Sequence, residues 1–134
     1  MQNFGTDTLI SAGNRDVFVI KYDSNGNFLW AQNGAAEYDD RGLDLATDDA
    51  NNIFVVGQYS DTIVFDFVYN NQVMNAGFVL KLDENGLQQT FKSMSGVQTL
   101  VYSIAIDNVN DVFITGDFRG TLAIVGSPST YVTA

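Results

Sequence analysis

The hydrophobic positions of this chain fall into short runs separated by turns rich in Asp, Asn and Gly. Runs of this length between such turns predict β-strands, and apolar residues at consecutive positions predict burial on both faces. No ten-residue segment keeps a helical period, because Gly and Asn interrupt every candidate. The pattern therefore predicts an all-β chain, with strands at residues 17–22, 27–31, 43–47, 53–58, 78–82, 87–91, 101–106 and 112–117.

The same pattern occurs twice along the chain. At a shift of sixty residues the identities are Phe18, Val19, Lys21, Asp23, Asn25 and Gly26 with Phe78, Val79, Lys81, Asp83, Asn85 and Gly86. At a shift of fifty-nine they are Ala46, Asp48, Asn51, Phe54 and Gly57 with Ala105, Asp107, Asn110, Phe113 and Gly116. Self-similarity at a fixed period is the sequence signature of a repeat architecture.

Each repeat contains four short strands, which is typical of one blade of a β-propeller. The predicted fold is therefore all-β, with blades of four-stranded antiparallel sheets and about two blades per chain. Residues 1–134 form one propeller segment: a half blade at 1–40, a complete blade at 41–95, and a half blade plus a linker strand at 96–134. Within the complete blade, the alternating residues 63–68 predict an extra hairpin on the blade's edge.

Most of the chain resembles the bacterial seven-bladed β-propeller repeat, abbreviated SBBP, whose pattern runs D-x-F-V-x-K-x-D-x-x-G-x-x-x-W, then Asp-Arg-Gly, then D-x-x-G-N-x-Y/F-V-x-G. The chain departs from it at Asn51, where the family prefers Gly, and the second copy lacks the Trp and the Asp-Arg-Gly loop. The resemblance implies a propeller scaffold, secreted or at the cell surface, although scaffolds of this kind host unrelated activities. The matching residues are Asp16, Phe18, Val19, Lys21, Asp23, Gly26 and Trp30, then Asp40, Arg41 and Gly42, then Asp48, Asn52, Phe54, Val55 and Gly57.

The repeat starts out of phase with the chain, with the second half of a unit first and a first half last. Two blades cannot close a ring, which takes four to eight. Three arrangements follow: further blades of a longer protein, head-to-tail assembly with copies of itself into a ring or filament, or a monomer whose halves pair. The expected partner is therefore the chain itself or further blades of a parent chain.

Composition narrows the function classes. A net charge of −10 disfavours nucleic acids and anionic membranes, which bind through Lys and Arg. The absence of Cys and His excludes Cys-ligated zinc and the Ser-His-Asp and Cys-His hydrolases within this chain. No apolar run is long enough to span a membrane, and residues 1–7 do not begin a signal peptide.

Three groups of residues are candidate sites, each with a structural alternative. Residues 23–27, Asp-Ser-Asn-Gly-Asn, could offer oxygens to calcium, although a hairpin turn explains them better. The carboxylates could perform acid–base work on a glycoside or hold a cation, although a structural Asp–Arg turn with a solvated acidic rim is the simpler interpretation. The aromatics could stack on a carbohydrate or pack in the core. The carboxylates are Glu37, Asp39, Asp40, Asp44, Asp48 and Asp49, and the aromatics are Trp30, Tyr38, Tyr59, Phe65, Phe67 and Tyr69.

These considerations favour a non-catalytic interaction or structural scaffold. We assign it no catalytic residue, cofactor or metal site. The alternative is a portion of a multi-blade hydrolase or lyase that acts on polysaccharide. The second copy weakens that alternative, since Ser103 and Leu100 stand where the first copy has Asp44 and Arg41.

Overall fold

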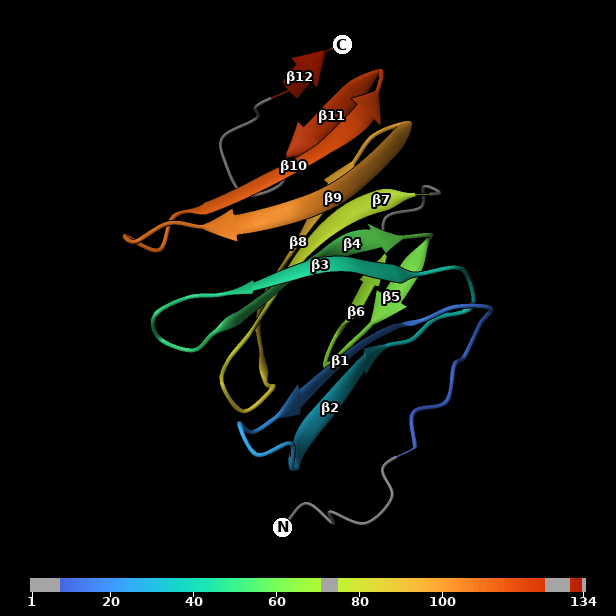
Figure 1. Ribbon diagram of the computed structural model, residues 1–134. Coiled ribbons are helices and arrows are strands. Elements are labelled where there is room, and N and C mark those ends of the chain that lie inside the picture. Colours follow the sequence, from blue (N-terminus) through green and yellow to red (C-terminus); the bar gives the residue numbers. More distant parts are fainter. Residues whose placement is uncertain (1–7, 71–74, 125–130, 134) are drawn as a thin grey trace.

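The computed structural model of the chain describes residues 8–70, 75–124 and 131–133 (Figure 1). These residues form antiparallel β-sheets and contain no helix, which confirms the predicted all-β class. In this part of the chain there is accordingly no helix that could cross a membrane.

Four strands form the sheet at the centre of the molecule: β3 (Arg41–Thr47), β4 (Ile53–Tyr59), β7 (Ala76–Leu82) and β8 (Gln88–Ser95). They pair in the order β3-β4-β7-β8 and are called the central sheet below. Two short strands extend this sheet beyond β8, first β11 (Thr121–Ile124) and then β12 (Tyr131–Thr133).

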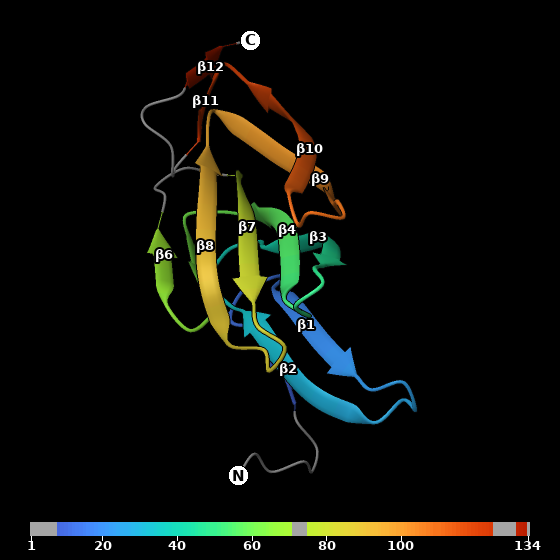
Figure 2. The same cartoon turned by 90° about the vertical axis from the view of Figure 1, so that its left-hand side faces the viewer.

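A two-stranded antiparallel sheet lies on each side of the central sheet (Figures 1 and 2). The N-terminal pair consists of β1 (Val17–Tyr22) and β2 (Phe28–Gly34), and the C-terminal pair of β9 (Gln98–Ile106) and β10 (Val112–Arg119). Every predicted strand is present, and several extend beyond the predicted ends. The two pairs remain separate sheets, so among the described residues no strand of one pair bonds a strand of the other.

Residues about sixty apart occupy equivalent places in the structure. Gly26 and Gly86 both close a hairpin turn with positive φ, 84° and 83°. Asn51 and Asn110 adopt the left-handed conformation in the other turn of each repeat, with φ of 60° and 67°. Asn tolerates this conformation better than most residues with a Cβ, which explains how it can stand where the SBBP pattern that the chain resembles has Gly.

The main hydrophobic core lies between the N-terminal pair and the central sheet. It contains Phe78, Leu80 and Leu82 of β7, which are fully buried, together with Val17 and Val19 of β1. These are the inward positions of alternating strands, as the period of two requires.

The extra hairpin forms as predicted, but not at the predicted place. β5 (Thr62–Val64) pairs with β6 (Val68–Asn70) as a separate sheet, whereas the edge of β8 is occupied by β11. Ile63 is fully buried in the main core, and Phe65 and Tyr69 pack against it. Burial of these three apolar side chains holds the hairpin over the core rather than on the sheet edge.

Candidate functional site

A hollow of about 750 Å³ lies between the N-terminal pair and β3. Residues 14–19 line one side, and residues 40–45 and Val55 line the other. Asp40 and Asp44, two of the candidate carboxylates, both lie along it. This hollow, called the β1–β3 hollow below, therefore brings two of the six candidate carboxylates to one place.

Asp40 is buried at the wall of the hollow, with 1% of its surface exposed. Its Oδ1 accepts a hydrogen bond from the Ser60 amide at 3.1 Å, while no described residue bonds its Oδ2. Burial raises the pKa of Asp40 to about 7, and the carboxylates of Asp16 and Asp39 act in the same direction. Because Asp40 is so little exposed, a substrate oxygen cannot reach it without an opening of the chain.

The raised pKa of Asp40 predicts that the chain loses stability as the pH rises from about 4 to about 7. In this window the folded chain holds a proton that the unfolded chain has released, so unfolding becomes easier at higher pH. The slope should stay below the roughly 1.4 kcal/mol per pH unit of a full proton difference. Urea midpoints measured across this range should fall for the native chain and change less for Asp40→Asn. Parallel curves for the two proteins would contradict the assignment.

Asp44 joins β3 to the C-terminal pair. Its Oδ2 accepts hydrogen bonds from the Ile104 amide at 3.0 Å and from the Ser103 hydroxyl at 2.7 Å. Its Oδ1 accepts one from the Leu45 amide. These bonds, led by the one from Ile104, lower the pKa of Asp44, so the carboxylate stays ionised and carries no proton to donate. Asp44 is therefore a contact between sheets.

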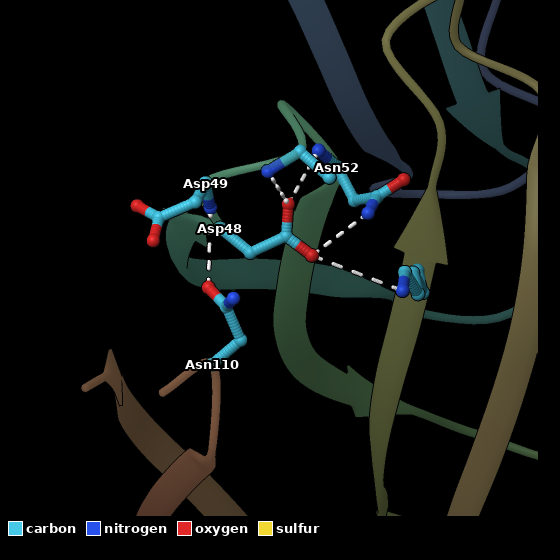
Figure 3. A network of polar contacts seen from close by, with 6 residues as sticks. Asp48, Asp49, Asn52 and Asn110 are labelled. Atoms are coloured by element: carbon cyan, nitrogen blue, oxygen red, sulfur yellow. Dashed lines mark hydrogen bonds and ion pairs between the residues drawn. The ribbon is translucent and has the colours of Figure 1, made fainter. Parts of the chain in front are cut away.

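Asp48 closes the turn between β3 and β4 (Figure 3). Its Oδ1 accepts hydrogen bonds from the amides of Ala50 and Asn52, and its Oδ2 accepts one from the Asn52 side chain. The bond from the Asn52 side chain is the largest of the effects that lower the pKa of Asp48. The Asp49 amide donates to Asn110 Oδ1 at 3.2 Å, which links this turn to the equivalent turn of the next repeat. Among the remaining candidate carboxylates, Glu37 is exposed and Asp39 forms a surface ion pair with Arg41 at 3.7 Å.

The candidate calcium turn has the geometry of a hairpin turn. Asp23 Oδ1 accepts hydrogen bonds from the amides of Asn25 and Asn27, and Oδ2 accepts one from the Asn27 side chain. Asp83 and Asp107 make the same pair of backbone contacts in their own turns. The described residues contain no group of three or more metal-ligating side chains.

Most of the candidate aromatics pack in the core. Trp30 and Tyr59 are buried, and Phe65 and Tyr69 pack against the same core. Tyr69 stacks on Phe91 with ring centroids 4.0 Å apart. The core interpretation is wrong for the other two, because Tyr38 and Phe67 are exposed.

Three side-chain hydrogen bonds that the sequence pattern does not indicate attach the N-terminal pair to the central sheet. Lys21 Nζ and Trp30 Nε1 both donate hydrogen bonds to the Glu84 carbonyl, at 2.8 and 3.0 Å. Gln32 Nε2 donates to the Gly86 carbonyl at 2.9 Å. A Cβ on Gly86 would lie 2.8 Å from the Trp30 ring, so this glycine serves the contact between sheets as well as the turn. The Asn-Gly pair indicated only the turn.

One comparison with known proteins bears on this arrangement. No family model matches the chain. An uncharacterized WD repeat-containing protein of Acanthamoeba polyphaga mimivirus is 26% identical over 143 residues, an alignment that covers 94% of this chain and 10% of that protein. WD repeats build β-propeller blades. The distant similarity therefore indicates a β-propeller-type repeat, in agreement with the antiparallel four-stranded sheet.

Proposed function

We propose that this chain is a run of β-propeller blades of the bacterial seven-bladed repeat type that serves as a non-catalytic structural or interaction scaffold. The central sheet is one complete blade, and the two pairs are halves of neighbouring blades. The missing strands come from copies of the chain or from further repeats of a longer protein. The extracellular or cell-surface location implied by the resemblance is part of the same proposal.

The observation that supports this proposal is that the hydrogen bonds of the Asp carboxylates close turns and join sheets. Asp23, Asp48, Asp83 and Asp107 close turns, and Asp44 joins one sheet to the next. A carboxylate held by two or three donors is positioned for structure, whereas a glycosidase needs two carboxyl groups that face a sugar from either side. The distant WD repeat relative also supports a scaffold of the β-propeller type.

A sugar-release assay separates the scaffold from the polysaccharide-active alternative. The purified chain should release no reducing ends from a panel of neutral and acidic polysaccharides, and Asp40→Asn should behave identically. Asp40 is the right position to change because its hydrogen bond goes to the Ser60 amide, whereas Asp44 bonds the C-terminal pair. Release of sugar that Asp40→Asn abolishes would overturn the scaffold proposal in favour of a carboxylate-dependent hydrolase or lyase.

A further inference from the structure

The strands β1 and β10 are each bonded on one side only within the described part of the chain. β1 pairs with β2, and β10 pairs with β9. Both strands expose large apolar side chains: Phe18 is 66% exposed on β1, and Phe113 is 58% exposed on β10. An apolar strand with an open edge is a template for pairing with another chain.

The central sheet shows what these two strands are built to pair with. By the repeat, β10 is equivalent to β4 at a shift of fifty-nine, and β1 is equivalent to β7 at a shift of sixty. β4 and β7 pair directly, with Val55 opposite Leu80 and Gly57 opposite Phe78. The strands with open edges are therefore the two equivalents of a pair that is already formed in the middle of the molecule.

The exposed fractions of equivalent side chains also differ between the paired strands and the strands with open edges. Phe78 and Leu80 on β7 are fully buried, whereas their equivalents Phe18 and Ile20 on β1 are 66% and 38% exposed. On β4, Val55 is 3% exposed, and its equivalent Ile114 on β10 is 38% exposed. The exposed side chains are thus apolar at positions that are buried in the complete central sheet.

The fit of an aromatic ring over a glycine is also repeated. A Cβ on Gly57 would lie 2.0 Å from the Arg41 carbonyl oxygen and 2.8 Å from the Phe78 ring, so glycine allows the close approach of both. The equivalent residues are Gly116 on β10 and Phe18 on β1. A Cβ on Gly116 would lie 2.0 Å from the Leu100 carbonyl oxygen, the equivalent of the Arg41 oxygen at Gly57, so the same close approach of backbone requires glycine in both copies.

A polar cluster is repeated as well. In the central sheet Lys81 Nζ lies 5.0 Å from the centre of the Phe54 ring and 3.8 Å from Asp48 Oδ2. The equivalent of Lys81 is Lys21 on β1. The equivalent of Phe54 is Phe113 on β10, and that of Asp48 is Asp107 in the turn before β10. A Lys ammonium has three donor hydrogens, so the bond from Lys21 to the Glu84 carbonyl leaves two for a new partner.

One chain cannot bring these two strands together, because the pairs that carry them lie on opposite sides of the central sheet (Figures 1 and 2). We propose that β10 of one copy pairs with β1 of a second copy in the register of β4 with β7, which completes a four-stranded blade shared between two copies. Ile114 then lies opposite Ile20 of the second copy, and Gly116 lies opposite Phe18.

The shared blade also accounts for the β1–β3 hollow. In one chain β9 lies beside β3 of the central sheet, and Asp44 bonds the two strands. The β9 strand of a second copy, added beyond β10, would take the corresponding place on the other side of β3. This inference rests on the proposed scaffold function and names its partner as a second copy. Because each copy carries both edges, the contact is head to tail and continues to a closed ring or an open filament.

Disulfide trapping tests the pairing and its register, since the native chain has no Cys. Directly opposite residues of antiparallel strands lie within disulfide range, and neighbouring positions point to opposite faces. The in-register variants are Ile20→Cys with Ile114→Cys, and Val19→Cys with Thr115→Cys. The control, Val19→Cys with Ile114→Cys, uses the same positions shifted by one residue. On mild oxidation at physiological salt, which screens the net charge of −10 per copy, at least one in-register variant should form a ladder of linked copies.

Light scattering of the unmodified chain over a concentration series is the second measurement, and it does not depend on how the variants fold. A mass that rises to a multiple of the chain mass, with cross-linking in register and none in the control, supports the proposal. A monomer at every concentration overturns it, and so does an assembly that cross-links equally in the control. A monomer that releases no sugar would leave the proposed scaffold function standing, with its missing strands supplied by a longer chain. Carboxylate-dependent sugar release would remove the scaffold function itself.

Discussion

Replacing Phe78 by alanine is expected to lower the free energy of unfolding by about 3–5 kcal/mol, the usual effect of deleting a buried aromatic ring. Phe78 is fully buried, and its ring contacts those of Tyr59, Phe65 and Phe91 at centroid distances of 5.5 to 6.3 Å. A loss of this size is a large part of the stability of a typical domain, so the variant should be largely unfolded under mild denaturing conditions.

Phe18→Ala is the matched control, because Phe18 is the same residue type at the equivalent position of the repeat. Because 66% of the Phe18 surface is exposed, Phe18→Ala should change the stability of the separate chain by less than about 1 kcal/mol. Urea unfolding followed by circular dichroism, at a concentration where the chain is monomeric, compares the two variants. Equal losses of unfolding free energy for both variants would mean that Phe18 and Phe78 are packed alike in the two copies of the repeat, which contradicts the structure.

At concentrations where copies associate, the control is expected to show a second effect. If Phe18 is buried against Gly116 of a second copy, Phe18→Ala should weaken association while it leaves the fold of the separate chain intact. Its unfolding midpoint should then depend less on protein concentration than that of the native chain, because association stabilises only the folded state.

The strands and turns of this protein could be predicted because they depend on local chemistry that the repeat displays twice. The Asn-Gly turn at 85–86 and the Asp at 83 indicate a hairpin by themselves, and Asp23 with Gly26 repeats the signal. The strand limits were less accurate because pairing with a neighbour extends a strand beyond its apolar run, as at the end of β8.

The contacts between sheets could not be predicted, because they depend on residues far apart in sequence. Nothing in the pattern indicates that Asp44 bonds the Ile104 amide, or that Trp30 donates to the Glu84 carbonyl. The predicted place of the β5–β6 hairpin was wrong for the same reason. The fully buried Ile63 packs on a core whose shape is determined by the fold as a whole. The repeat did carry one clue to the contact made by Trp30, because the second copy has Thr90 at the equivalent position.

Amide hydrogen exchange tests most directly the central claim, which is that one complete blade lies between two halves with open edges. In the dilute chain, amides of β4 and β7 that bond each other should exchange slower than the open-edge amides of β1 and β10 by about three orders of magnitude. At high concentration the open-edge amides should become protected as copies associate. If those amides are as slow as β4 and β7 in the monomer, or if β4 and β7 exchange fast, the account is wrong.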